Sequence, residues 1–327
     1  MLPDKSKIKI GNNKANIENF INDVIIIPRR SLRYWSNITN QTPAAKIGYI
    51  GQHLASLITG VRGTGSGARG DDLADTTEVK SCNKVDQADK CRCCGHRVMR
   101  YDVKCPNCDS EDIERKNDSK WLFSIRDEYE LDQYKNLNRI LLLLMDYPGF
   151  LNNDFSDIMI SAFEIYPKEN RMNVFNQLID NHYRNIYRPK ADEGKKTNPM
   201  NLHPWSFQFY KCNPILVFQC VITDIDNNPE IKIIKYIDPE EERGIDTESV
   251  LMPSNLLTKK EWNILLSSAN YEQDICPLLK DNIQKEKFES LSNDDKIKYL
   301  PYLDEKLRDF IPLRPIVSAT QKDHYHR

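Results

Sequence analysis

Two acidic residues, Asp72 and Glu78, lie close in sequence to Lys80. They belong to residues 69–80, whose sequence is RGDDLADTTEVK. Carboxylate oxygens are the ligands that hard divalent cations such as Mg²⁺ prefer. The sequence predicts a strand at residues 78–82, and Glu78 and Lys80 share one face of it because strand side chains alternate with period 2. Together with Asp72, they can hold a metal ion, orient a water molecule and stabilise developing negative charge. Metal-assisted phosphodiester hydrolysis needs these three functions.

The first acid of this group has two alternatives, Asp71 and Asp75. Asp72 precedes Leu73, which we expect to pack inward and anchor the loop. The glycine-rich residues 60–70 lead into these acids and would let the backbone approach a phosphate. A Glu-x-Lys pattern alone is not specific, because charged residues are mostly exposed and this chain has 48 acidic and 46 basic residues.

Cysteine spacing predicts a second site. Cys91, Cys94, Cys105 and Cys108 form two Cys-x-x-Cys pairs separated by ten residues. Four thiolates close a tetrahedral Zn²⁺ site that has no open position, so this zinc would be structural. We expect the polar segment around it to need the metal to fold. Cys93 is an alternative ligand to Cys91 or Cys94.

Composition narrows the class of protein. The 327 residues carry a net charge of −2, so a nucleic-acid binder must concentrate its positive charge locally. No apolar run reaches the roughly 20 residues of a membrane helix, and the N-terminus lacks the features of a signal peptide. We therefore expect a cytosolic protein that does not associate with membranes. Its nine cysteines then favour metal ligands and buried thiols over disulfides.

Hydrophobic periodicity predicts an α/β or α+β fold. We expect Pro28 to end the first helix, so that the basic and aromatic residues after it form a loop. Thr258 is expected to cap a late helix. The predicted helices span residues 14–27, 44–59, 122–139 and 172–187; the predicted strands span 78–82, 140–145, 159–166, 215–223 and 231–237; residues 83–118 are an insert and 189–214 a surface segment.

An aspartate at a strand end followed by Glu-x-Lys on the next strand resembles the PD-(D/E)xK nuclease superfamily. Gly70 and Asp71 stand where that superfamily has its proline. Residues 63–82, GTGSGARGDDLADTTEVKSC, followed by a four-cysteine insert, are most similar to the MamI-type Type II restriction endonucleases. The specific motif covers residues 44–110. Relatives often carry a glutamate where this chain has Ala55, so that either Gln52, His53 or no residue takes its supporting place.

This resemblance implies a nuclease core, a central mixed sheet flanked by helices, with an inserted four-cysteine zinc ribbon. Residues 1–82 would hold the N-terminal helices and the active-site strand, residues 83–118 the ribbon, and residues 119–327 the rest of the core with recognition and dimerisation elements. It also implies Mg²⁺-dependent double-strand DNA cleavage at a short, continuous or interrupted palindrome by a homodimer in the bacterial cytoplasm. A DNA methyltransferase would be a genetic partner and not a bound subunit.

Carried over by position, Asp72 and Glu78 would bind Mg²⁺, and Lys80 would orient or help deprotonate the attacking water and stabilise the pentacovalent phosphate. Phosphate contacts need positive charge, and asparagine is a residue type that reads adenine. The candidate DNA-binding residues form three groups: Arg62 with Arg69; Arg29, Arg30 and Arg33; and Lys195, Lys196, Asn198 and Asn201.

Two other functions fit the same residues. In a non-catalytic zinc-ribbon protein that binds nucleic acid, Glu78 and Lys80 would form only a surface pair. In a PD-(D/E)xK enzyme of repair or recombination, the chemistry would be the same, but the enzyme would select branched or nicked structures instead of a sequence.

Overall fold

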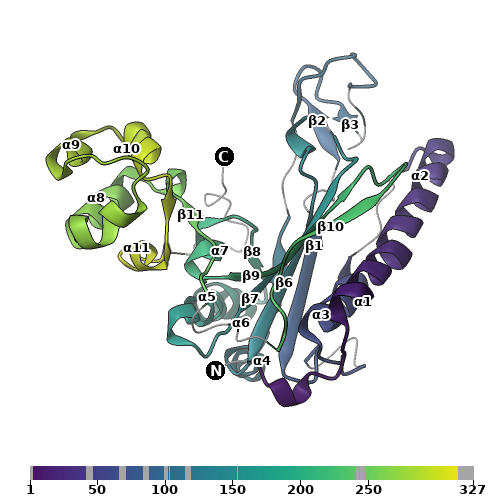
Figure 1. Cartoon of the computed structure of the whole chain (residues 1–327), viewed down its shortest axis with the longest axis horizontal. Coiled ribbons are helices and arrows are strands. Elements are labelled where there is room, and N and C mark those ends of the chain that lie inside the picture. The colour runs from purple at the N-terminus through teal and green to yellow at the C-terminus, as the bar shows by residue number, and fades with distance from the viewer. Residues whose placement is uncertain are drawn as a thin grey trace. The chain divides into compact units, whose positions relative to one another are not determined.

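The computed structural model describes residues 3–41, 47–65, 71–83, 88–98, 102, 104–114, 119–152, 154–240, 243 and 247–315. The chain forms two compact units (Figure 1). The first contains Met1–Trp121, Leu137–Glu164 and Leu216–Asp246, and the second contains Leu122–Asn136, Ile165–Ile215 and Thr247–Arg327.

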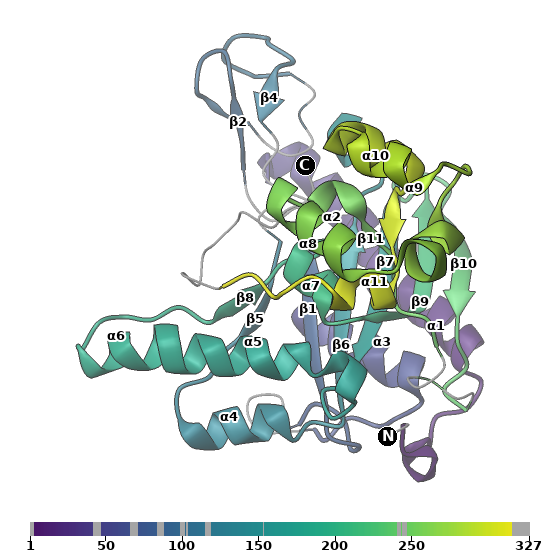
Figure 2. The same ribbon diagram turned by 90° about the vertical axis from the view of Figure 1, so that its left-hand side faces the viewer.

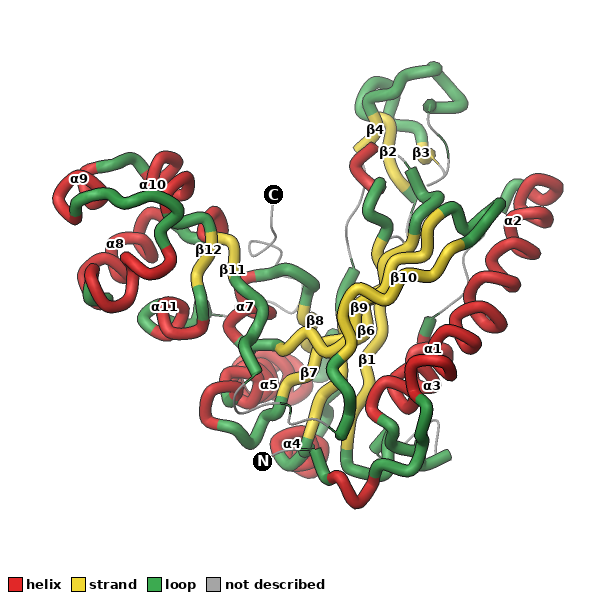
Figure 3. Tube along the Cα trace, in the orientation of Figure 1, coloured by secondary structure: helices red, strands yellow, loops and turns green. Residues whose placement is uncertain are grey.

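A five-stranded sheet forms the centre of the first unit, with the strand order β1-β6-β7-β9-β10 (Figure 3). β1 runs parallel to β6, whereas β9 and β10 form an antiparallel hairpin. Every residue of β6 is buried, as expected for an inner strand covered on both faces. This mixed sheet with helices confirms the predicted α/β class. The strands span Thr77–Asn83 (β1), Arg139–Asp146 (β6), Ile158–Ile165 (β7), Ile215–Thr223 (β9) and Glu230–Tyr236 (β10).

The N-terminal helices are α1 (Asn13–Ile21), α2 (Ile27–Thr39) and α3 (Gly48–Thr59), with a π-helical turn between α1 and α2. The prediction that Pro28 ends the first helix was wrong. Pro28 occupies the first turn of α2, directly after the π-helical turn, and its fixed φ is compatible with the helix that continues through it. The basic and aromatic residues after it are therefore helical.

Close packing fixes α3 against β1. A Cβ atom at Gly51 would lie 1.9 Å from the Ser81 Oγ atom. Only glycine allows this approach, which brings the next helical residue, Gln52, to the side of β1 that carries the acidic loop.

The insert has its own small sheet, with the order β3-β2-β4. Its strands are β2 (Asp89–Cys91), β3 (Arg97–Val98) and β4 (Ile113–Glu114). Its buried core consists of Cys91, Val98 and Cys105, with Ile113 packed against them. So few apolar side chains supply little stabilisation, in keeping with a segment expected to need a metal.

The second unit is largely helical. α5 (Val174–His182) continues through a π-helical turn into α6 (Arg188–Asp192), as Figure 2 shows. The Thr258 prediction is confirmed, because Thr258 and Glu261 form a capping box at the start of α8. The other helices are α4 (Glu128–Lys135), α7 (Phe207–Lys211), α8 (Lys259–Ser268), α9 (Lys285–Ser290), α10 (Asn293–Tyr299) and α11 (Glu305–Asp309); the short strands are β11 (Met252–Pro253) and β12 (Tyr302–Leu303).

Two sequence predictions after the insert were wrong. The predicted helix at residues 122–139 is instead the short strand β5 (Trp121–Phe123) followed by α4. The predicted surface segment at residues 189–214 contains β8 (Met200–Leu202) and α7, with Phe207 and Phe209 fully buried. Their aromatic area outweighs the prolines and lysines that suggested an exposed segment. Within the described residues, no helix is long and apolar enough to cross a membrane.

A buried network of charges joins the sheet to the loop that precedes β1. Glu164 Oε1 accepts hydrogen bonds from Arg139 Nη1 at 3.1 Å and Arg243 Nη1 at 2.7 Å. Arg139 also donates to Asp75 Oδ2 at 2.5 Å and to Thr77 Oγ1 at 2.9 Å. Two arginines and two acids thus neutralise one another away from water, the condition under which buried charges are tolerated.

We expect Glu164→Gln to lower the free energy of unfolding by about 3–5 kcal/mol, because it leaves two buried guanidinium groups short of a counter-charge. Urea unfolding followed by circular dichroism measures this change. The matched control is Glu128→Gln, since Glu128 pairs with Arg184 and Arg188 on the surface and should contribute less than about 1 kcal/mol. Equal losses for the two variants would contradict the account of the network.

Candidate active site and thiolate cluster

Residues 71–77 form a tight loop that leads directly into β1. The backbone N–H groups of Asp72 and Leu73 both donate to Thr77 O, at 3.1 and 3.2 Å. Leu73 is only 1% exposed, so it anchors the loop as predicted. Thr76 has a positive φ of 62°, the sharp bend that lets the chain turn back into the strand.

The loop places the carboxylate of Asp72 beside β1. Asp72 Oδ2 accepts a hydrogen bond from the Val79 N–H at 2.7 Å, and Oδ1 accepts one from Gln52 Nε2 at 2.5 Å. Both oxygens are therefore oriented, one by the strand and one by α3. Gln52, a supporting candidate from the sequence, does contact Asp72.

Glu78 and Lys80 lie on the same face of β1. Both are partly buried, and Lys80 Nζ is hydrogen-bonded to Glu78 Oε1. The alternate residues Thr77 and Val79 are buried on the opposite face. The structure thus brings Asp72, Glu78 and Lys80 together at the beginning of one strand.

Burial, together with repulsion between neighbouring carboxylates, raises the pKa values of Asp72 and Asp71. Burial raises the pKa of Asp72, and the charges of Glu78 and Asp71 raise it further, against the opposing effects of the Val79 N–H and Lys80. The pKa of Asp71 is raised by burial and by the charges of Glu78 and Asp75. A partly desolvated cluster of carboxylates is the donor set that suits a hard divalent cation, because a bound cation would offset both effects.

Asp75 differs from the other two acids of the loop. It is 5% exposed, and its carboxylate contacts Arg139 and the hydroxyl of Thr77. Asp71 is half-buried, and its backbone carbonyl accepts a hydrogen bond from Thr64 Oγ1 at 2.7 Å. Asp75 is therefore bound into the buried network, whereas Asp71 and Asp72 are only partly buried.

The candidate DNA-binding arginines lie in different environments. Arg62 is exposed, next to the acidic loop, and Arg69 lies outside the described residues. Arg29 is 8% exposed and pairs with Asp226, while Arg33 is half-buried and approaches the same carboxylate at 3.9 Å. Arg30 and Arg33 line an open pocket of about 800 Å³ with Tyr34, Trp35 and Asn37 of the same helix.

The candidates of the second unit follow α6. Lys195 and Lys196 are exposed, and Lys195 pairs with Glu193 at 2.6 Å. Asn198 is exposed and lies two residues before β8, and Asn201 is half-buried within β8.

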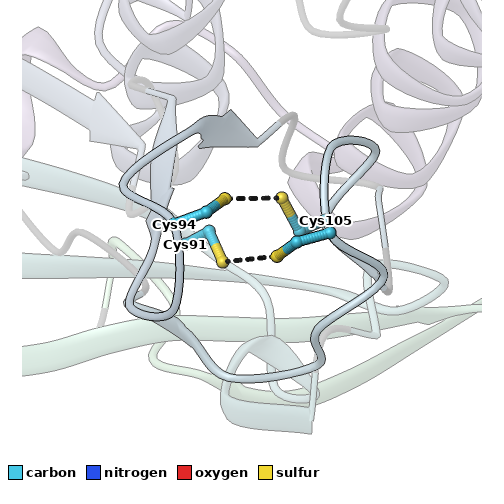
Figure 4. A group of neighbouring side chains, drawn as sticks. Cys91, Cys94 and Cys105 are labelled. Carbon is cyan, nitrogen blue, oxygen red and sulfur yellow. Dashed lines mark hydrogen bonds between the residues drawn. The ribbon is translucent and has the colours of Figure 1, made fainter.

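The four predicted cysteines converge in the insert (Figure 4). The Sγ atoms of Cys91, Cys94, Cys105 and Cys108 all lie within 4.8 Å of one another, with Cys91–Cys108 at 3.5 Å and Cys94–Cys105 at 3.6 Å. A tetrahedral site with Zn–S bonds of about 2.3 Å has an S–S edge of about 3.8 Å. These spacings fit zinc, and Cys93 is exposed and lies outside the cluster.

The two cysteine pairs sit on equivalent turns. The N–H of Gly95 donates to Cys91 O, and the N–H of Asp109 donates to Cys105 O, both at 2.9 Å. Gly95 and Asp109 both have positive φ values, of 75° and 59°. A hydrogen bond from the Asn107 side chain lowers the pKa of Cys94 to about 6, which favours the thiolate that a metal requires.

Sequence reasoning missed the residue that anchors the acidic loop, Arg139. Its available signal was a charged residue immediately before the apolar run ILLLLM, where a buried strand begins. A charge at the end of such a run must find a buried partner or reach solvent.

Comparison with known proteins assigns the family. A model of the MamI restriction endonuclease family matches residues 34–255. The Type II restriction enzyme MamI of Microbacterium ammoniaphilum is 41% identical over 61 residues, which cover 19% of this chain and 20% of that relative, so the match spans about a fifth of its length. No solved structure matches the chain significantly. Because the family model covers more than half of the 327 residues, the chain belongs to the MamI restriction endonuclease family.

Proposed function

We propose that this protein is a Type II restriction endonuclease that cuts both strands of DNA at a short palindrome, continuous or interrupted, in a Mg²⁺-dependent reaction. The observation that carries the proposal is the meeting of Asp72, Glu78 and Lys80 at the start of β1 in a chain of this family. An acid before a strand and Glu-x-Lys on it, within a mixed sheet, support a PD-(D/E)xK core.

Asp72 and Glu78 are the residues that would hold Mg²⁺. When bound, Mg²⁺ would lower the pKa of the attacking water and offset the charge on the phosphate. Asp75 is left out of the proposed set because its carboxylate neutralises Arg139 in the interior. Asp71 contributes negative charge to the site without a proposed ligand role.

The other residues of the site orient these groups. The Val79 N–H and the Gln52 amide hold the Asp72 carboxylate in a fixed orientation, so little reorganisation is needed when substrate arrives. The Lys80 ammonium group, held beside Glu78, would donate a hydrogen bond that orients the attacking water. Its positive charge would also help deprotonation by stabilising the hydroxide as the proton passes to solvent. The same charge stabilises the negative charge that develops on the pentacovalent phosphate.

The wider assembly follows from the proposed activity. A palindromic target goes together with a two-fold symmetric homodimer. Zinc in the insert would be structural, since four thiolates leave no open position. Exposed Arg30 and Arg62 are proposed phosphate contacts. The enzyme would act in the bacterial cytoplasm, with a methyltransferase encoded as its genetic partner.

We expect Glu78→Ala to reduce DNA cleavage by at least about 100-fold, the typical effect of removing one group that stabilises the transition state. Incubation with plasmid DNA and Mg²⁺ measures it, with circular dichroism to show that the fold survives. The control is Glu18→Ala, at an exposed acid on α1. Normal cutting by Glu78→Ala would refute the site.

The same assay separates the other functions. Discrete fragments from wild-type protein support a restriction enzyme. DNA binding without cleavage would indicate a non-catalytic zinc-ribbon protein, and preference for nicks, flaps or branches over intact duplex would indicate a repair nuclease.

The raised pKa of Asp72 predicts how activity depends on pH. A metal ligand must be deprotonated, so cleavage should fall as pH decreases, beginning at a higher pH than an ordinary aspartate would produce. Because Mg²⁺ and protons compete for the same carboxylates, raising the Mg²⁺ concentration should move this acid limb to lower pH. Single-turnover rates across pH at two Mg²⁺ concentrations test this. An acid limb that does not respond to Mg²⁺ would contradict the assignment.

Metal analysis tests the thiolate cluster. Purified protein should contain about one zinc per chain. Cys105→Ala should lose zinc and lower the melting temperature of the insert, because Cys105 is both a ligand and a core residue. Cys93→Ala is the matched control and should retain zinc. A folded wild-type protein without zinc would exclude the site.

A further inference from the structure

The segment before α1 carries a dense group of exposed lysines. Residues 3–14 contain four lysines and one acid, in a chain whose net charge is −2. Lys5, Lys7 and Lys9 are all exposed, and here they are called the lysine strip. The one acid of this segment, Asp4, interacts electrostatically with Lys7 and Lys9. The strip is therefore a local excess of positive charge.

Local structure orders the lysine strip. The Asp4 side chain accepts a hydrogen bond from the Ser6 N–H at 3.0 Å and caps the short 3-10 turn Lys5–Lys7. Ile8 and Ile10 are then half-buried, whereas Lys7 and Lys9 are exposed on either side of Ile8. From Ile8 to Ile10 this alternation is that of an extended chain with one face on the protein and one in solvent, and it directly follows the 3-10 turn that contains Lys5 and Lys7.

Backbone pairing attaches this extended chain to the end of α3. The N–H groups of Lys9 and Ile10 both donate to Gly60 O, at 2.8 and 3.0 Å, and Ile8 pairs with Val61. Gly60 has a φ of +70°, and a Cβ atom there would lie 2.8 Å from Ile8 Cγ2. Both the conformation and the close approach require glycine.

The pairing continues from Gly60 to the acidic loop. Gly63 pairs with Leu73, and the N–H of Thr64 donates to Asp72 O at 3.1 Å. Three residues of extended chain span about 10 Å, so the backbone at Lys9, which bonds to Gly60, is tied by this short segment to the loop that carries Asp72. In Figures 1 and 2 the N-terminal segment lies at the end of the first unit where β1 begins.

We propose that the lysine strip binds the DNA phosphates next to the scissile one. This inference rests on the proposed nuclease function. Duplex DNA presents a phosphate every 3.4 Å or so along each strand, which a row of point charges can follow without reading sequence. Lysine suits this role because its ammonium group is a compact charge on a flexible stem. The lysine strip would thus set the position of the DNA backbone relative to Asp72 and Glu78.

The test compares salt dependence of binding in the Glu78→Ala background, in which DNA stays intact. The variant is Lys5→Ala/Lys7→Ala/Lys9→Ala, and the probes are a duplex carrying the mapped cleavage site and a scrambled duplex. The slope of log K against log salt should become less steep by up to about 2.7 per chain, or about 0.9 for each of three lost phosphate contacts. Affinity should fall by the same factor for both duplexes, because phosphate contacts are independent of sequence.

Two matched variants make the result specific. Lys5→Arg/Lys7→Arg/Lys9→Arg retains the charge and should retain the slope. Lys259→Ala/Lys260→Ala/Lys287→Ala removes the same charge from exposed helical positions of the second unit and should leave the slope nearly unchanged.

The outcomes separate this inference from the proposed function. A wild-type enzyme that cuts DNA, combined with an unchanged slope in the alanine triple variant, would overturn the lysine strip alone. An equal loss in the control variant, a loss confined to the cleavable duplex, or a change only in self-association would overturn it too. Wild-type protein that neither binds nor cuts DNA would refute the function and the inference together.

Discussion

The site depends on one buried interaction, the contact of the Arg139 guanidinium with Asp75 and Thr77 at the start of β1. Glu164 supplies the second counter-charge from β7. Because the cost of leaving any of these charges unpaired is several kcal/mol, the loop has one favoured position on the sheet. That position presents Asp72 to the Val79 N–H. The Asp75 carboxylate is thereby bound to Arg139 in the interior, whereas Asp72, three residues earlier, is the proposed metal ligand.

Residues close in sequence were predictable because local geometry alone places them. The two-residue spacing of Glu78 and Lys80 puts them on one strand face wherever the strand packs. The spacing of the cysteine pairs likewise specifies a four-sulfur cluster, and the Thr258 cap needs only its own helix. The α/β class also followed from the order of periodic and apolar segments, whereas the mixed sheet was implied by the family resemblance. The structure adds the Gln52 contact with Asp72, which depends on the close packing of α3 at Gly51.

Features that depend on distant residues could not be predicted in this way. Arg139 meets Asp75 across 64 positions, and Arg243 meets Glu164 across 79. Nothing in the sequence near either arginine identifies its partner. Pro28 was misread because proline is compatible both with the end of one helix and with the first turn of the next. The burial of α7 was missed because Phe207 and Phe209 alternate with polar residues in a proline-rich context.

Locating a divalent cation in the full chain would test the central claim most directly. Crystals grown with Mn²⁺, with zinc retained in the insert, would give anomalous scattering that identifies the metal positions. The account predicts a manganese peak between the carboxylates of Asp72 and Glu78, with Asp75 still paired to Arg139. A peak on Asp75, or the absence of any peak at Asp72 and Glu78 in well-ordered crystals, would contradict it.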